Sequence, residues 1–227
     1  MLALVLVAAA VAAACSDAAG AARQQPPPPT DAGGVPEQVT DGVVASVGLV
    51  RSAGVFGSGW VVAPGAVVTN EHVARTGTGD IYIDYSDGER VECYTVVSDR
   101  DMDLAVLKCD TGGRRPVALG GTAVPDTPVV AVGYPEGVGP TVTAGRITDE
   151  RPVVRGIDTV GFTAAIEPGS SGSPVVDPSG RVLAIATFGG GFGVPVDRLR
   201  PLVEVAEQYP ATKAGAVVVN TMPMLRA

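Results

Sequence analysis

Residues 68–74, Val-Thr-Asn-Glu-His-Val-Ala, contain the only histidine of the 227-residue chain. Further along, residues 101–107 read Asp-Met-Asp-Leu-Ala-Val-Leu, and residues 169–174 read Gly-Ser-Ser-Gly-Ser-Pro. A serine hydroxyl is a poor nucleophile near neutral pH. It needs an imidazole to take its proton and a carboxylate to orient that imidazole. One histidine, one aspartate and one glycine-flanked serine, in this order, are therefore candidates for that chemistry.

Each of these segments has a simpler explanation when it is taken alone. A histidine among apolar residues is often a hydrogen-bonded core residue, and a run of glycine and serine is often a plain loop. An aspartate before Leu-Ala-Val-Leu can mark a turn at the edge of a strand. Their joint occurrence, each with fitting neighbours, favours a catalytic set over a structural β domain without a site.

The composition favours strands and turns over long helices. The chain is 46% hydrophobic and 18% charged, with 30 glycines and 19 prolines. Short valine-rich runs alternate with glycine, proline and aspartate, which is typical of an all-β protein. The net charge of −8 disfavours nucleic acid and anionic lipid as electrostatic partners.

Two series of short strands are expected, separated by a break at 120–127 that is rich in glycine and proline. Two such series predict two similar β units packed side by side. Asp197 is expected to cap a final helix at 198–208, where apolar residues recur on one face. The expected strands are 43–50, 59–63, 66–69, 81–85, 90–98 and 104–109, then 128–133, 141–148, 159–165, 174–176, 182–188 and 194–196.

The N-terminal residues resemble an export signal. An apolar run rich in alanine and valine covers residues 2–14; it is short for a membrane span but fits the apolar core of a secretory signal. Residues 1–14 are therefore predicted to be a signal peptide. Residues 15–40, with four prolines at 26–29, are predicted to be a disordered tether. Residues 209–227 have no clear pattern and are expected to form a C-terminal tail.

Cys15 leaves alternatives open. Residues 13–15 resemble the end of a bacterial lipobox, which predicts cleavage before Cys15 and its lipidation. Ala12 stands where such boxes usually carry leucine, and no lysine or arginine precedes Arg23. Cleavage without lipidation is therefore one alternative, and a disordered alanine-rich tail is another. The protein is expected in the cell envelope on a lipid anchor, or secreted, with no other membrane contact.

The chain has three cysteines. If Cys15 is lipidated or removed with the signal, Cys93 and Cys109 remain as an even pair, which in an exported protein indicates a disulfide. They lie on two expected strands joined by a short turn centred on Asp101. In a simple hairpin the two cysteines fall directly opposite each other, which brings them within bridging distance. Two buried free thiols are the alternative.

Together these segments resemble the trypsin-like serine proteases, and within them the bacterial high-temperature-requirement family. The resemblance covers roughly residues 43–208, including 57–62 (Gly-Ser-Gly-Trp-Val-Val) and 166–176 (Ile-Glu-Pro-Gly-Ser-Ser-Gly-Ser-Pro-Val-Val). It implies an all-β fold of two six-stranded antiparallel β-barrels, with the site in the cleft between them, and a C-terminal helix. The protease domain is expected at 41–208, with barrels at about 41–120 and 121–197. No peptide-binding domain of the kind that many relatives carry is expected after residue 208.

The resemblance also assigns roles to residues. It makes Ser171 the nucleophile, His72 the general base and then acid, and Asp103 the orienting carboxylate. Asp103 is chosen over the two nearby aspartates because it directly precedes Leu-Ala-Val. Ser171 is chosen over the neighbouring serines because it stands in the frame Gly-x-Ser-Gly. The backbone N–H groups of Gly169 and Ser171 are expected to form the oxyanion hole.

The resemblance also implies a substrate preference. The floor of the pocket for the residue before the cut would lie six residues ahead of the nucleophile, at Ala165. Thr187, Phe188 and Gly189 are the expected wall. A small apolar floor without a carboxylate cannot pair with lysine or arginine, so we expect cleavage after small to medium apolar residues.

The favoured interpretation is an exported serine endopeptidase that acts on protein or peptide substrates. The alternative is a protease-fold module that binds peptides or unfolded proteins with little or no cleavage, because an intact triad does not guarantee a formed oxyanion hole. Neither interpretation needs a cofactor or a metal, and none is expected. The oligomeric state is left open.

Overall fold

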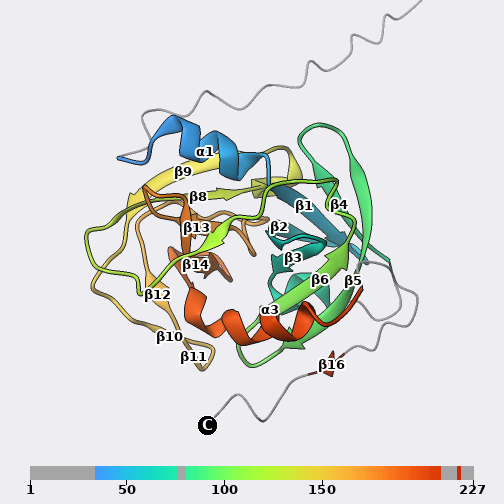
Figure 1. Cartoon of the computed structure of the whole chain (residues 1–227). Coiled ribbons are helices and arrows are strands. Elements are labelled where there is room, and N and C mark those ends of the chain that lie inside the picture. The colour runs from blue at the N-terminus through green and yellow to red at the C-terminus, as the bar shows by residue number, and fades with distance from the viewer. Residues whose placement is uncertain (1–33, 76–79, 211–218, 221–227) are drawn as a thin grey trace, which may run out of the picture.

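The computed structural model describes residues 34–75, 80–210 and 219–220. Figure 1 shows two β units side by side, the first in blue to green and the second in yellow to orange, with α1 above and α3 below. The predicted signal peptide, most of the predicted tether with Cys15, and most of the predicted tail lie outside the described residues. No helix within the described ranges is long and apolar enough to span a bilayer.

The first unit is a closed barrel. Neighbouring strands are antiparallel in the order β5-β4-β1-β2-β3-β6, and β5 also pairs with β6, which closes the sheet. Successive residues of a strand point to opposite faces, and in β3 and β6 both faces are buried. One face of the sheet fills the barrel interior, where Val50, Val61, Ile83 and Leu107 are buried. The short β16 (Val219–Asn220) runs parallel to β5. The six barrel strands are β1 (Val47–Ser52), β2 (Val55–Ala63), β3 (Ala66–Thr69), β4 (Ile81–Tyr85), β5 (Arg90–Asp99) and β6 (Leu104–Cys109).

The second unit is a curled sheet that closes less fully than the first. Its strands follow the path β12-β15-β14-β13-β8-β9, with β7 beside β14, and an isolated bridge between Ile147 and Phe162 links the two ends. The all-β fold of two antiparallel units with a C-terminal helix is confirmed, with a curled half-barrel as its second unit. The strands are β7 (Ala118–Leu119), β8 (Pro128–Gly133), β9 (Thr141–Arg146), β10 (Val153–Val154), β11 (Ile157–Asp158), β12 (Val160–Gly161), β13 (Pro174–Val176), β14 (Arg181–Ala186) and β15 (Phe192–Pro195).

A shared core joins the two units. Trp60 from β2 and Ile185 from β14 are fully buried in one hydrophobic cluster. The helix α1 (Glu37–Val44) lies on β8, and α3 (Arg200–Ala206) lies on β5 and β6; both add residues to this cluster. Burying one large apolar side chain contributes about 1.5–3 kcal/mol, so this cluster holds the two units in a fixed relation.

Most of the expected strands are confirmed, and the differences have local causes. The strand expected at 43–50 begins at Val47, because the residues before it form α1, with its buried face toward the core. Asp197 does not cap α3: it lies in the 3₁₀ helix η2 (Val196–Arg198), and α3 follows without a side-chain cap. The strand expected at 159–165 is reduced to β12, because the chain leaves the sheet after Gly161.

Cys93 on β5 and Cys109 on β6 are joined by a disulfide, which confirms the predicted pair. The two residues are directly opposed in the antiparallel register, and their Cα atoms are 4.5 Å apart. A register shift between Thr95 and Val97 lies beyond the pair and does not disturb it. Both cysteines are buried with the interior cluster of the first barrel.

Replacing both cysteines by alanine should lower the free energy of unfolding by about 3 kcal/mol, because the unfolded chain then loses its cross-link. Urea unfolding of wild type and double variant, each with and without reductant, measures this effect. Reductant should bring the wild type to the value of the double variant and leave the double variant unchanged. Equal unfolding midpoints for oxidised wild type and double variant would contradict the prediction.

Candidate active site

Three segments meet where the two units face each other. The short helix α2 (Glu71–Ala74) follows β3 and carries His72, and the turn between β5 and β6 carries Asp103. The loop before β13 carries Ser171. Val73 is buried in the first-barrel core, which anchors α2 and leaves its neighbour His72 partly exposed. The first unit thus supplies an imidazole and a carboxylate, and the second supplies a serine.

The His72 imidazole is held by the Asp103 carboxylate. The Nδ1 atom of His72 lies 2.9 Å from both Oδ1 and Oδ2 of Asp103, and the backbone N–H of His72 donates to Oδ1 at 3.0 Å. The Asp103 side chain is only 3% exposed, and that of His72 is 25% exposed. An ionised carboxylate can only accept hydrogen bonds, so Nδ1 carries the proton and Nε2 is the basic nitrogen.

Further donors hold Asp103 in place. The Thr187 hydroxyl, at the end of β14, donates to Oδ2, and the Asn70 side-chain amide donates to the Asp103 carbonyl oxygen at 2.9 Å. Asp103 has φ +54°, a left-handed conformation that is uncommon for a residue other than glycine. A buried carboxylate needs such partners, since an unpaired buried charge costs several kcal/mol. The carboxylate therefore has a single orientation, toward His72.

The two nearby aspartates lie elsewhere. Asp99 Oδ1 accepts the backbone N–H groups of Asp101 and Met102, each at 2.9 Å, and so shapes the turn before Asp103. Asp101 is exposed on that turn. The geometry therefore pairs His72 with Asp103, the residue that the sequence assigned to this role.

The loop that carries Ser171 lies against β2 of the first barrel. The backbone N–H of Ser58 donates to the Ser171 carbonyl oxygen at 2.7 Å. A Cβ atom on Gly172 would lie 2.1 Å from the Ser58 carbonyl oxygen, and one on Gly57 would lie 2.6 Å from a methyl carbon of Val73. Only glycine fits at these two positions. Their close approach brings the Ser171 loop, β2 and the helix that carries His72 together.

Every carbonyl oxygen from residue 168 to 171 accepts a hydrogen bond. Glu136 N–H donates to Pro168 at 2.7 Å, the Ser58 hydroxyl to Gly169 at 2.9 Å, Ser173 N–H to Ser170 at 3.0 Å and Ser58 N–H to Ser171 at 2.7 Å. The C=O and N–H groups of one trans peptide point in opposite directions, so the N–H groups of residues 169 and 171 point away from the donors that bind the carbonyl oxygens of residues 168 and 170. Within the described part of the chain, the N–H groups of residues 169 and 171 donate to no acceptor. Both are therefore available to a ligand.

The face of His72 is covered by Phe188. The two ring centroids are 4.9 Å apart and the rings are inclined by 21°, while the Arg155 guanidinium lies 4.1 Å from the centroid of Phe188. Arg155 is at the tip of the β10–β11 hairpin, with φ +52° before Gly156 at φ +85°. Phe188 also has a positive φ, +52°. A stack of imidazole, phenyl ring and guanidinium therefore crosses from the first unit to the second.

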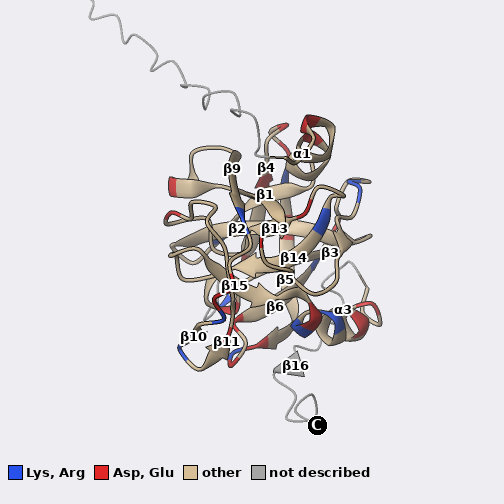
Figure 2. Ribbon diagram, turned by 90° about the vertical axis from the view of Figure 1, so that its left-hand side faces the viewer, with Lys and Arg blue, Asp and Glu red and all other residues tan. Residues whose placement is uncertain are grey.

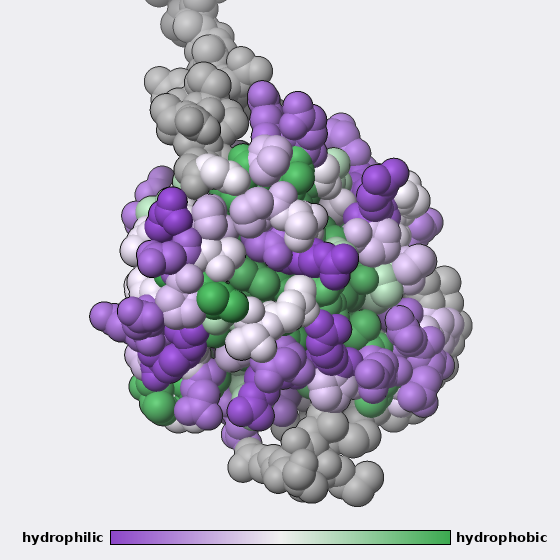
Figure 3. Space-filling model, turned by 60° about the vertical axis from the view of Figure 1, so that its left-hand side comes forward, coloured by the Kyte–Doolittle hydropathy of each residue, from purple (hydrophilic) through white to green (hydrophobic). Residues whose placement is uncertain are grey.

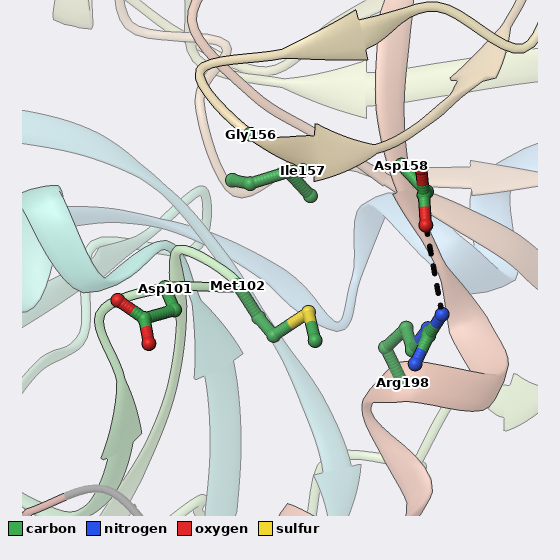
Figure 4. Close-up of a pocket in the computed structure, with 6 residues that line it drawn as sticks. All are labelled: Asp101, Met102, Gly156, Ile157, Asp158 and Arg198. Carbon is green, nitrogen blue, oxygen red and sulfur yellow. Dashed lines mark ion pairs between the residues drawn. The ribbon is translucent and has the colours of Figure 1, made fainter. Parts of the chain in front are cut away.

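Two adjoining cavities border this stack. A cavity of about 520 Å³ is lined by His72, Phe188 and Arg155 together with residues of the β5–β6 turn. A second, of about 160 Å³, lies between that turn and the β10–β11 hairpin; Figure 4 shows Met102 reaching toward it and Arg198 paired with Asp158 on its far side. The ion pair spans 3.9 Å. Both cavities include Asp101, Gly156 and Ile157, so they form one hollow beside the imidazole.

The four residues expected to form the substrate pocket have different surroundings in the structure. Ala165 lines a cavity of about 60 Å³ on the side of the loop near Ser170 and Ser173. Thr187 is fully buried and bonded to Asp103, Phe188 covers His72, and Gly189 follows with φ +73°. None of the three cavities described above is lined by all four residues, and the pocket assignment stays a prediction.

Charged and apolar side chains occupy different parts of the surface. Figure 2 shows lysine, arginine, aspartate and glutamate mostly at the periphery, and Figure 3 shows hydrophobic side chains gathered across the middle of one face.

Burial raises the pKa of Tyr134, next to the Ser171 loop, to about 12, so its phenol stays neutral near physiological pH. Among the described residues no group of three histidine, cysteine, aspartate or glutamate side chains could hold a metal ion.

Several residues of the site were not predicted from the sequence. Asn70 and Ser58 stand in the quoted segments, but nothing local indicates what they contact. Thr187 was expected to line the pocket, but its hydrogen bond to Asp103 was not predicted. For Arg155 a partial signal did exist, because a glycine at the second of two residues between short apolar runs favours a hairpin turn.

The fold and this site define a class: two packed β units, with a histidine–aspartate pair on one and a glycine-framed serine on the other. A family model for the trypsin-like peptidase domain matches residues 57–185, more than half of the chain. The chain therefore belongs to the trypsin-like peptidase family.

Relatives with curated descriptions are proteases. The chloroplastic Protease Do-like 1 of Arabidopsis thaliana is 34% identical over 169 residues, 65% of this chain and 38% of that protein. A probable periplasmic DegP-like serine endoprotease of Brucella suis is 33% identical over 189 residues, 75% of this chain and 36% of that protein. The chain thus spans less than two fifths of the length of these relatives.

Solved structures share the fold. The serine endoprotease from Yersinia pestis has a TM-score of 0.67 and 28% identity, over 78% of this chain and 66% of that one. A serine-to-alanine mutant of Rv3671c from M. tuberculosis H37Rv, described as an inactive form, has a TM-score of 0.68 and 26% identity, over 82% of this chain and 98% of that one.

Removing the ring of Phe188 should make His72 more accessible. Diethyl pyrocarbonate modifies imidazoles, and because the chain has one histidine, the rate of modification reports on His72 alone. Phe188→Ala should raise this rate, since it uncovers the face of the imidazole. Val153→Ala, at an exposed position of the β10–β11 hairpin, is the control and should react as wild type does. Equal rates for Phe188→Ala and wild type would show that the stack does not shield His72.

Proposed function

We propose that this protein is a serine endopeptidase with Ser171, His72 and Asp103 as its triad. The observation that carries the proposal is the buried Asp103 carboxylate, which accepts a hydrogen bond from Nδ1 of the chain's only histidine. This bond leaves Nε2 as the base that a serine nucleophile requires. The two free N–H groups of the Ser171 loop support the same reading, because an oxyanion needs such donors.

In the proposed reaction, Ser171 Oγ attacks the carbonyl carbon of the scissile peptide while His72 Nε2 takes the hydroxyl proton. The N–H groups of Gly169 and Ser171 stabilise the negative charge that develops on the carbonyl oxygen. His72 then gives its proton to the leaving amine, the C–N bond breaks, and an acyl ester remains on Ser171. A water molecule then attacks the ester carbonyl while His72 Nε2 takes its proton. The ester C–O bond breaks, His72 returns the proton to Ser171 Oγ, and the second product leaves as a carboxylic acid.

A second candidate is a protease-fold module that binds peptides with little cleavage. The stack of Phe188 on His72 favours it, because this ring occupies space beside the imidazole that a substrate would otherwise approach. Phe188 must move for a substrate to pack against that face. We place this candidate second because the Asp103–His72 pair is fully formed in the same structure.

We propose that the substrates are proteins or peptides cut after small to medium apolar residues. The support is the residue type at position 165, since an alanine floor leaves a lysine or arginine without a partner. Burying a valine or leucine side chain there is worth about 1.5–3 kcal/mol and requires no polar partner.

We further propose that the protein is exported. The periplasmic and chloroplastic relatives support action outside the cytosol, and the apolar run at 2–14 supports a secretory signal. On this proposal Cys15 either carries the lipid that anchors the protein to the cell envelope or becomes the first residue of a secreted protein. An oxidising compartment also suits the Cys93–Cys109 disulfide.

Purified wild-type protein should hydrolyse casein, and Ser171→Ala should lower the rate by at least about 10⁴-fold. His72→Ala should be comparably damaging, because a triad acts as a unit. Ser179→Ala, in the exposed turn before β14, is the matched control and should cleave as wild type does. Cleavage by Ser171→Ala at the wild-type rate would refute the triad. A wild type that binds denatured casein without cutting it would favour the binding module.

Mass spectrometry of the casein fragments tests the specificity. Most cuts should follow alanine, valine or leucine, and few should follow charged residues. Ala165→Asp should shift cleavage toward lysine and arginine, because it adds a carboxylate at the proposed pocket floor. A majority of wild-type cuts after basic residues would overturn the pocket assignment while leaving the triad intact.

A further inference from the structure

The side chain of Ser58 links the first barrel to the loop that carries Ser171. Ser58 lies on β2 and is fully buried. Its hydroxyl accepts the backbone N–H of Tyr134 at 2.9 Å and donates to the carbonyl oxygen of Gly169 at 2.9 Å. Both partners belong to the second unit, so a single hydroxyl connects two backbone segments that lie far from it in sequence.

The backbone of Ser58 takes part in the same contact. Its N–H donates to the Ser171 carbonyl oxygen at 2.7 Å, and its carbonyl oxygen accepts the Thr69 hydroxyl at 2.7 Å. Ser58 therefore binds the loop at Gly169 through its side chain and at Ser171 through its backbone. These are the two residues whose N–H groups are free to bind an oxyanion.

The hydroxyl bond fixes the part of the loop between those two donors. Gly169 has no Cβ and a φ of +95°, so its own conformational preference does little to fix the peptide that follows it. That peptide is held within the loop by Ser170 N–H, which donates to Glu167 at 2.9 Å, and from the first barrel by the Ser58 hydroxyl. The relative orientation of the two oxyanion donors depends on this peptide plane.

We propose that Ser58 is a positioning residue, whose hydroxyl keeps the Gly169 and Ser171 N–H groups aimed at one point. The inference rests on the proposed function, because it assigns Ser58 a role in the oxyanion site of that reaction. Oxyanion donors act when they are already in place as the charge develops. A loop free to rotate at Gly169 would bind substrate as before and stabilise the transition state less.

Kinetics separates this role from a general loss of structure. Losing an interaction made only in the transition state lowers kcat and leaves KM unchanged, whereas damage to the binding cleft raises KM. Removing a whole oxyanion donor costs about 10²–10³ in kcat, so we expect misorientation in Ser58→Ala to lower kcat by about 10- to 100-fold. The rate of phosphonylation by a fluorophosphonate should fall in parallel, because its adduct needs the same two donors.

The experiment compares Ser58→Ala, Ser58→Cys and Ser52→Ala on a peptide that the wild type cleaves. Ser58→Cys keeps the size of the side chain and replaces the hydroxyl by a weak hydrogen-bonding group. Ser52 is the matched control: it is also a buried serine of the first barrel, and its hydroxyl has no hydrogen-bond partner among the described residues. Circular dichroism melting confirms that each variant is folded, and Ser58→Cys carries the test if Ser58→Ala does not fold.

Lower kcat with unchanged KM in both Ser58 variants, and wild-type kinetics in Ser52→Ala, would support the proposal. Wild-type kcat in either folded Ser58 variant would overturn it, and so would a change confined to KM. These outcomes are distinct from failure of the proposed function, in which the wild type itself would neither cleave the peptide nor react with the fluorophosphonate.

Discussion

The buried carboxylate of Asp103 is the interaction on which the rest of the site depends. Its donors come from both units, His72 from α2 of the first and Thr187 from the end of β14 in the second. Two of these donors, the backbone N–H and Nδ1 of His72, belong to the same unit as Asp103, and the Thr187 hydroxyl is the donor that the second unit adds. Packing of the two units therefore completes the hydrogen bonds of this carboxylate and brings the segment of Ser171 to the side of His72.

The conformation of the loop that carries Ser171 depends on the same packing of the two units. Its carbonyl oxygens accept hydrogen bonds from β2, from Glu136 and, within the loop, from Ser173, and the N–H groups of residues 169 and 171 donate to no acceptor among the described residues. The glycines at 57 and 172 let β2 and this loop approach more closely than any side chain would allow. Catalytic groups and their supports therefore come from the interface itself, and neither unit alone contains a complete set.

Local patterns in the sequence predict the parts of the molecule that depend on neighbours along the chain. Short valine-rich runs between glycine, proline and aspartate predicted most strands, and the spacing of Cys93 and Cys109 predicted the disulfide. The contacts of Ser58 and Thr187 could not be predicted, because their partners lie 111 and 84 residues away and only the packing of the two units brings them close. The position of Phe188 on His72 is likewise a consequence of tertiary packing.

Peptide mapping after reaction with a fluorophosphonate tests the central claim most directly, because the reagent reports a serine that is activated by a base and faces an oxyanion site. The account predicts one adduct per chain, on Ser171, and no adduct in folded His72→Ala. An adduct on Ser170 or Ser173, or no adduct in folded wild-type protein, would contradict it.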